Sequence, residues 1–178
     1  METSSIRVLV VEDSEKFRKF ICSTLGERPE LKIVGEDSDG LQALQSADKL
    51  QPDLILLDIG LPSLNGIEVA RQTLKLSPKS KILFVSQESS ADLVQEALAL
   101  GALGYVVKWD AGKELLTAVE AVVQGRQYLS SRLTIAPTRR TRKPSDLLHK
   151  LALLLQASRK RVSLAATRLN SILMMELL

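Results

Sequence analysis

The sequence predicts an α/β domain built on a five-stranded, doubly wound parallel sheet, with a helical tail after it. Short, mostly apolar segments alternate with segments of helical spacing, and this alternation occurs five times before residue 125. The apolar segments are continuous, which is typical of strands that are buried on both faces of a parallel sheet. Because crossovers between parallel strands are right-handed, few strand orders are available, and we expect the order 2-1-3-4-5.

Each strand is predicted where a short apolar run stands between turn residues. In chain order, these runs lie at residues 6–11, 31–35, 54–57, 81–85 and 104–107. Helices are predicted where apolar residues recur every three or four positions. In chain order, they lie at residues 14–27, 40–50, 66–76, 91–100 and 111–124. The first four helices end near Gly26, Pro52, Pro78 and Gly101, since proline cannot continue a helix and glycine favours the C-terminal cap.

Length and composition limit the classes of protein that fit. A chain of 178 residues with 45% hydrophobic content is long enough for one globular domain and an appendage. No apolar run approaches the ~18 residues that cross a bilayer, and the polar start leads directly into a strand, so we expect a cytoplasmic protein without a membrane partner. Cys22, the single cysteine, lies on an apolar helical stripe and is predicted to be a core thiol. A single histidine, His149, excludes a multi-histidine metal centre.

Charge is unevenly distributed along the chain. Residues 1–136 carry 15 Lys and Arg against 19 Asp and Glu, a net charge of −4, whereas residues 137–178 carry 9 against 2, a net charge of +7. A basic segment of this kind indicates either a solvated linker or a surface for a polyanion such as DNA.

Polar residues follow four of the predicted strands. Asp58 comes directly after the run at 54–57, Glu12 and Asp13 follow the first strand, and Ser86 and Lys108 follow the fourth and fifth. A lone aspartate after a strand is often only a helix cap or a turn former. In the predicted strand order, however, the first and third strands are neighbours, so the three carboxylates converge at the carboxyl edge of the sheet, where open α/β folds bind ligands.

This cluster suits a divalent cation and a phosphoryl group. Three carboxylates at one edge repel each other, and hard oxygen ligands favour Mg²⁺ or Mn²⁺ with positions left open for phosphate oxygens. Lys108 could pair with Asp58 in the empty site and with a phosphoryl oxygen in the filled one, while Ser86 offers a hydroxyl. If Asp58 attacks phosphorus as a nucleophile, the product is an acyl phosphate, which is labile to water.

The motifs resemble those of the receiver domain of bacterial two-component response regulators, over about residues 5–130. The resemblance lies in Val10-Val11-Glu12-Asp13, in Leu57-Asp58-Ile59-Gly60-Leu61-Pro62 with Asn65-Gly66-Ile67-Glu68, in Ser86, and in Gly101-Ala102-Leu103-Gly104-Tyr105-Val106-Val107-Lys108. It implies a flavodoxin-like fold and a sensor histidine kinase as phosphodonor.

The resemblance also implies roles for individual residues. Asp58 would be the phosphoacceptor. Asp13 would bind Mg²⁺, Glu12 would do so through water, and the carbonyl of Gly60 would complete the protein ligands. Such a chain would not be an enzyme acting on a separate substrate, although it would catalyse its own phosphorylation and dephosphorylation.

Two further positions match the switch of these receivers. Ser86 would bond to the phosphoryl group, and Tyr105 would change its rotamer in response. The phosphate would draw Ser86 and its loop inward, make room for the Tyr105 ring and remodel the face of the fourth helix and fifth strand. The alternative for Tyr105 is an ordinary aromatic residue on a half-buried strand.

The C-terminal segment is the part that fits this resemblance least. We predict a receiver domain at 1–130, a basic linker at 131–144 and a helical tail at 145–178. The motifs resemble receivers that are usually joined to a LuxR-type helix-turn-helix, but the segment after residue 136 is too short for such a domain and shows no convincing recognition helix. A helical hairpin, a DNA-binding or other polyanion-binding segment and a truncated output domain all stay open.

The output of such a regulator has two alternatives, and two other classes of protein fit the residues less well. As a response regulator, it would control an output, most readily transcription, or it would act without DNA through protein contacts or homodimerisation of its tail. A Mg²⁺-dependent aspartyl-phosphate phosphohydrolase typically has a second aspartate two residues after the first, where this chain has Gly60. A flavodoxin-like FMN carrier needs hydroxyl and glycine residues after the first strand, and Glu12 and Asp13 would instead repel the phosphate.

Overall fold

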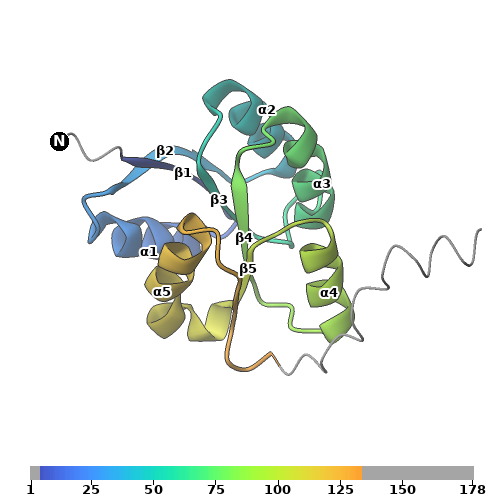
Figure 1. Ribbon diagram of the computed structural model, residues 1–178. Helices are drawn as coiled ribbons and strands as arrows, with labels where there is room; N and C mark the ends of the chain where they lie inside the picture. Colours follow the sequence, from blue (N-terminus) through green and yellow to red (C-terminus); the bar gives the residue numbers. More distant parts are fainter. Residues whose placement is uncertain (1–4, 134–178) are drawn as a thin grey trace, which may run out of the picture. The chain divides into compact units, whose positions relative to one another are not determined.

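The computed structural model describes residues 5–133, which form a single sheet with helices on both of its faces (Figure 1). The chain divides into two units, Met1–Thr134 and Ile135–Leu178. The tail predicted for 145–178, and most of the linker predicted for 131–144, therefore lie outside the described residues and stay predictions. Within the described range, no helix is both long and apolar enough to cross a membrane.

Within residues 5–133, the sheet has six parallel strands in the order β2-β1-β3-β4-β5-β6. The strands are β1 (Ile6–Val11), β2 (Leu31–Asp37), β3 (Leu54–Leu57), β4 (Lys81–Ser86), β5 (Gly104–Val107) and β6 (Tyr128–Leu129). The helices are α1 (Glu15–Gly26), α2 (Gly40–Leu50), α3 (Gly66–Leu76), α4 (Ala91–Ala99), the 3-10 turn η1 (Lys108–Asp110) and α5 (Ala111–Val123). The predicted order of the first five strands is confirmed, and their bounds agree with the prediction to within two residues.

The sixth strand was not predicted. After α5, Gly125 adopts a φ of 76°, which glycine tolerates without strain, and the chain turns back toward the sheet. β6 then pairs with the outer edge of β5, with Gly104 opposite Tyr128 and Tyr105 opposite Leu129. A strand of two residues contains no apolar run, so the periodicity of the sequence gives no signal for it.

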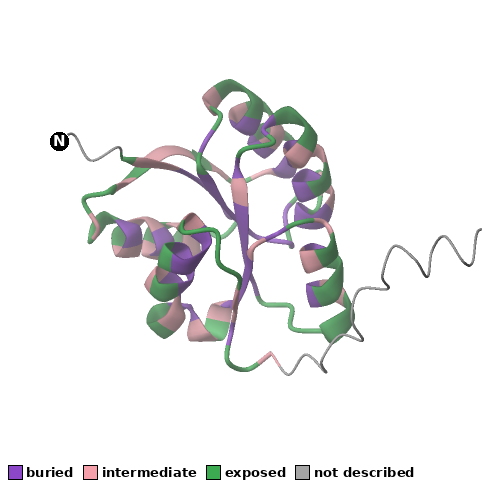
Figure 2. Cartoon of the chain, viewed as in Figure 1, coloured by how far each residue is buried: buried purple, intermediate pink, exposed green. Residues whose placement is uncertain are grey.

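The helices lie in two layers, with α1 and α5 on one face of the sheet and α2, α3 and α4 on the other (Figure 1). Successive strand residues point to opposite faces, and both faces are covered. β3 and β5 are therefore buried along their whole length, and β1 and β4 are buried except at their first residues (Figure 2). A cluster of buried side chains lies between the sheet and the α1/α5 layer. Its members include Val8, Val10, Ile21, Leu25, Leu54, Leu56, Leu83, Val85, Val106, Leu115, Val119 and Val122.

Strand register places the ends of β1 and β3 side by side. Val11 pairs with Leu57, and the N–H of Asp58 donates to the carbonyl of Val11 at 2.9 Å. Glu12 and Asp58 are the next residues of the two strands and therefore meet at the carboxyl edge of the sheet. On the other side of β3, β4 and β5 end together, because Ser86 pairs with Val107.

Candidate functional site

Asp58 is held rigidly at the end of β3 and is only 5% exposed. Its Oδ1 accepts a hydrogen bond from the N–H of Ile59 at 2.7 Å, which leaves Oδ2 for other partners. The turn after it packs tightly: the N–H of Gly66 donates to the carbonyl of Ile59 at 2.9 Å, and a Cβ on Gly66 would lie 2.0 Å from the carbonyl oxygen of Asp58. Only glycine fits at this position, so the turn fixes the backbone of Asp58.

The ammonium group of Lys108 lies between two carboxylates. Its Nζ is 2.8 Å from Oδ2 of Asp58, and it is 2.8 and 2.7 Å from Oε1 and Oε2 of Glu12. The side chain is 9% exposed, and Nζ also lies 4.9 Å from the centroid of the Phe17 ring. The predicted pairing of Lys108 with Asp58 is present. The contacts with Glu12 and Phe17 were not predicted.

Burial and charge act on these groups in opposite directions. Burial raises the pKa of Glu12, the hydrogen bond from Lys108 opposes this, and the neighbouring charge of Asp58 adds to the increase. Burial alone would lower the pKa of Lys108, but its hydrogen bonds to Asp58 and Glu12 outweigh burial and raise the pKa above 10.5. Lys108 therefore stays charged in the folded protein.

The three predicted acidic residues form one cluster. Glu12, Asp13 and Asp58 each offer a carboxylate oxygen, and these oxygens lie within 4.8 Å of one another. Glu12 and Asp58 are buried, whereas Asp13 is exposed. All-oxygen donors at this spacing fit a hard divalent cation, and a single ammonium group does not neutralise three carboxylates.

A cavity of about 410 Å³ opens beside this cluster. Its lining contains five of the predicted site residues, namely Asp13, Asp58, Gly60, Ser86 and Lys108. Gly60 is exposed near the carboxylate, since a Cβ at this position would lie 3.7 Å from Oδ2 of Asp58. The cavity therefore brings acidic, cationic and hydroxyl groups to one space.

Ser86 and Tyr105 both contact the loop after β4. Ser86 is 1% exposed, and its Oγ accepts a hydrogen bond from the N–H of Glu88 at 3.3 Å. Tyr105 is completely buried beside Phe84, and its hydroxyl donates to the carbonyl of Glu88 at 2.8 Å. Burial raises the pKa of Tyr105 to about 12, so the hydroxyl keeps its proton. The two predicted switch residues are thus connected through Glu88.

The sequence model of the response regulator receiver domain matches residues 8–120 of this chain. The chain belongs to this family. The resemblance described above is therefore confirmed at the level of the family, and with it the flavodoxin-like fold.

Two transcription regulators are similar to this chain. The transcriptional regulatory protein DegU of Brevibacillus brevis is 32% identical over 131 residues, which are 74% of this chain and 56% of that protein. The DNA-binding transcriptional activator DevR/DosR of Mycobacterium tuberculosis is 37% identical over 131 residues, which are 74% of this chain and 60% of that protein. The matched residues thus span less than two thirds of the length of these relatives.

Solved structures give the same family. A LuxR-family two-component response regulator from Aurantimonas sp. SI85-9A1 is 28% identical with a TM-score of 0.69, and the match covers 73% of this chain and 93% of that chain. The response regulator domain of Thermotoga maritima CheB is 33% identical with a TM-score of 0.63, over 67% of this chain and 97% of that chain. Receivers thus occur in proteins of different overall function.

Proposed function

We propose that this receiver accepts a phosphoryl group on Asp58 and changes the loop and strand around Tyr105 in response. The observation that carries the proposal is the position of Asp58. Its carboxylate lies at a cavity that also contains Asp13 and Ser86, and its Oδ2 is 2.8 Å from the Lys108 ammonium. A carboxylate nucleophile can accept a phosphoryl group, and a cation and a hydroxyl donor can stabilise the charge on its oxygens.

In the proposed reaction, an oxygen of Asp58 attacks phosphorus while the bond between phosphorus and the donor breaks. The leaving group takes the electron pair of that bond, and an acyl phosphate forms on Asp58. Lys108 then exchanges its contact with Asp58 for one with a phosphoryl oxygen, and the Ser86 hydroxyl donates to another. Glu12 retains Lys108 during this exchange because it contacts the same Nζ.

The acidic cluster is the proposed site of Mg²⁺ or Mn²⁺. Asp13 and Asp58 would bind the ion directly, the carbonyl of Gly60 would complete the protein ligands, and Glu12 would act through water. When bound, the ion supplies positive charge opposite the phosphoryl oxygens.

The proposed switch follows from the shared contact with Glu88. Ser86 binds the N–H of Glu88 and Tyr105 binds its carbonyl. A Ser86 hydroxyl that turns toward a phosphoryl group would draw the loop after β4 inward through its bond with the N–H of Glu88, and the same loop contacts Tyr105. We infer that phosphorylation changes the position of this loop relative to the Tyr105 ring.

We propose a sensor histidine kinase, encountered in the cytoplasm, as the phosphodonor and transcription as the output of the whole protein. The names of DegU and DevR/DosR support a transcriptional output. Because the C-terminal segment has a net charge of +7, DNA binding by residues 137–178 is one route, and homodimerisation or contact with another protein without DNA is the alternative. We further propose that the chain does not act as an enzyme on a separate substrate. One similar protein is an enzyme, the protein-glutamate methylesterase/protein-glutamine glutaminase of Thermotoga maritima. The match covers 58% of this chain but only 30% of that enzyme, so most of the enzyme lies outside the match.

Phosphorylation with a small donor tests the assignment of Asp58. Incubation with acetyl phosphate and Mg²⁺ should add the mass of one phosphoryl group to the full chain, and Asp58→Asn should abolish the addition. Asp48→Asn is a matched control, because Asp48 is exposed on α2, outside the site. The same adduct on the Asp58→Asn chain would remove Asp58 from its proposed role.

Metal binding can be followed by the fluorescence of Trp109, the single tryptophan of the chain, which is 79% exposed directly after Lys108. Asp13→Asn should weaken the affinity for Mg²⁺ by at least several-fold, and an unchanged affinity would contradict the assignment of Asp13 as a ligand.

A gel shift tests the output. Genomic DNA fragments are mixed with the full chain and with a chain that lacks residues 137–178, and their retardation is compared. Equal retardation of the two chains would exclude a DNA-binding role for that segment.

A further inference from the structure

The segment after α5 contacts β5 through both its backbone and a side chain. β6 pairs with the first half of β5, and the ladder ends where the N–H of Ser130 donates to the carbonyl of Tyr105 at 2.9 Å. The last N–H of β5, that of Val107, then donates to the Ser130 side chain, with Oγ at 3.0 Å. A hydroxyl group therefore takes the place of the next backbone partner.

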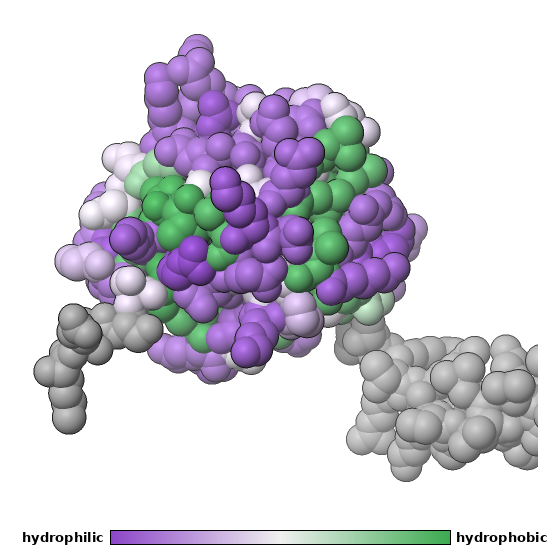
Figure 3. Space-filling view, turned by 90° about the horizontal axis from the view of Figure 1, so that it is seen from above, coloured by the Kyte–Doolittle hydropathy of each residue, from purple (hydrophilic) through white to green (hydrophobic). Residues whose placement is uncertain are grey.

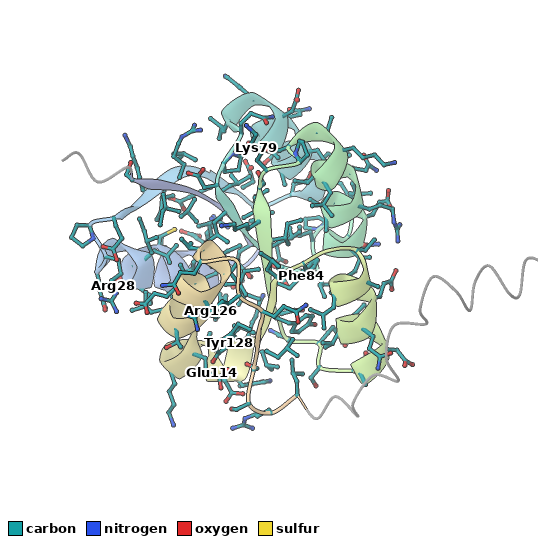
Figure 4. The ribbon with its side chains drawn as sticks, in the orientation of Figure 1. Arg28, Lys79, Phe84, Glu114, Arg126 and Tyr128 are labelled. Carbon is teal, nitrogen blue, oxygen red and sulfur yellow. The ribbon has the colours of Figure 1, made fainter. Side chains whose placement is uncertain are left out.

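Glu114, in the first turn of α5, orients this hydroxyl. Ser130 Oγ donates to Oε2 of Glu114, and Oε1 accepts from the N–H and Oγ of Ser131 at 3.2 and 2.6 Å (Figure 4 labels Glu114). Burial alone would raise the pKa of Glu114, but the hydrogen bonds from Ser130 and Ser131 outweigh it and lower the pKa. The carboxylate is thus ionised and can only accept, so the Ser130 proton points to Glu114 and a lone pair faces Val107.

Water cannot easily replace this bond. Ser130 is 2% exposed and Val107 is 3% exposed. Without the hydroxyl, the N–H of Val107 would be buried without a partner, and such a group either moves the backbone or costs its full desolvation.

Val107 is directly connected to the phosphorylation site. It precedes Lys108, whose Nζ contacts Asp58 at 2.8 Å. On the opposite edge of β5, Val107 is in register with Ser86, which lines the cavity beside Asp58. The end of β5 therefore lies between Ser86 on one side and Ser130 on the other.

We propose that Ser130 is a positioning residue for Lys108, acting through its hydrogen bond with the N–H of Val107. The inference rests on the proposed phosphorylation of Asp58. It adds that the Ser130 hydroxyl, directly after β6, determines how well Lys108 is aligned for phosphoryl transfer. Ser130 itself does not line the cavity at Asp58.

The test compares three variants of the full chain by the rate at which acetyl phosphate and Mg²⁺ form the Asp58 adduct, followed by intact mass. Ser130→Ala should lower this rate by about tenfold, because a small displacement of a charged group at the site is enough for such a loss. Ser130→Thr keeps a hydroxyl and should restore most of the rate. Ser131→Ala is the matched control, since Ser131 bonds to the same Glu114 but not to β5.

Each outcome bears on a different claim. An unchanged rate in Ser130→Ala, equal slowing by Ser130→Ala and Ser131→Ala, or no recovery in Ser130→Thr would overturn the positioning role. If the unchanged chain gains no phosphoryl group, the proposed function fails and the inference fails with it. If Ser130→Ala does not fold, Glu114→Ala takes its place, because it removes the acceptor that orients Ser130. It should slow the reaction in the same direction, and an unchanged rate would again overturn the inference.

Discussion

Replacement of Lys108 by methionine should strongly destabilise the fold in the absence of metal. Methionine keeps an unbranched side chain against Phe17 but removes the positive charge between Glu12 and Asp58. These two carboxylates are almost fully buried, with side-chain exposures of 1% and 6%. Without the ammonium group, no positive charge offsets the repulsion between the two carboxylates.

The magnitude follows from the contacts of Nζ. At the 2.8 Å that separates Nζ from Asp58, the attraction is about 6 kcal/mol for an effective dielectric constant of about 20, and the contact with Glu12 adds a similar amount. Desolvation of the three ions offsets much of this attraction. Removal of one partner from a buried ion pair costs roughly 3–5 kcal/mol, and we expect a loss in this range.

The assay is urea unfolding of the full chain in a metal chelator. The chelator is needed because Mg²⁺ at about 100 times its Kd stabilises the folded state by about 2.7 kcal/mol through linkage alone. Lys113→Met is the control, since Lys113 is exposed on α5, and its effect should stay within about 0.5 kcal/mol. A change below about 1 kcal/mol for Lys108→Met would refute the view that the ion pairs neutralise buried carboxylates.

Three further predictions concern the packing and titration of the same region. Gly66→Ala places a Cβ 2.0 Å from the carbonyl oxygen of Asp58 and should destabilise the fold by about 1–3 kcal/mol in urea unfolding. Gly112→Ala is the control, because its Cβ meets no atom within 4 Å and should not destabilise the fold. Equal effects of the two substitutions would contradict the packing described for the turn. Tyr105→Phe removes a hydrogen bond of 2.8 Å and should cost about 1 kcal/mol by the same measurement; no loss would show that the hydroxyl contributes nothing to stability. Because burial raises the pKa of Glu12, the folded state binds this proton more tightly than the unfolded chain, so the free energy of unfolding should fall as the pH rises from 4.5 through the folded-state pKa. Glu12→Gln should flatten that part of the pH profile, and an unchanged slope would assign it to another group.

Much of the sheet could be predicted because its central strands are buried on both faces. The run at 54–57 is continuous and apolar, and it is a strand with the predicted bounds. Pro52 and Pro78 mark the ends of the helices before β3 and β4, because proline cannot continue a helix whatever its neighbours are. β6 lacks both kinds of signal, because it is two residues long and pairs through its backbone.

The site was predictable where side chains follow predicted strands. Glu12, Asp13 and Asp58 converge because β1 and β3 are neighbours, and the handedness of the crossovers leaves this order among the few that are possible. The roles of Glu88 and Ser130 were missed for a different reason. Glu88 acts through its backbone N–H and carbonyl, and Ser130 depends on the unpredicted β6, so neither contact has a counterpart in residue type or spacing.

Much of the surface seen in Figure 3 is polar, with apolar patches between the charged side chains. The order of the strands leaves β2 and β6 at the two edges of the sheet, and within residues 5–133 no further strand pairs with either of them. β2 presents the exposed charged residues Lys32 and Glu36, and β6 offers only two residues for pairing. Charge and short length are two of the ways in which proteins keep an edge strand from pairing with a neighbouring molecule. We therefore expect that copies of this domain do not join their sheets, and that any association between them uses side chains on helices and loops.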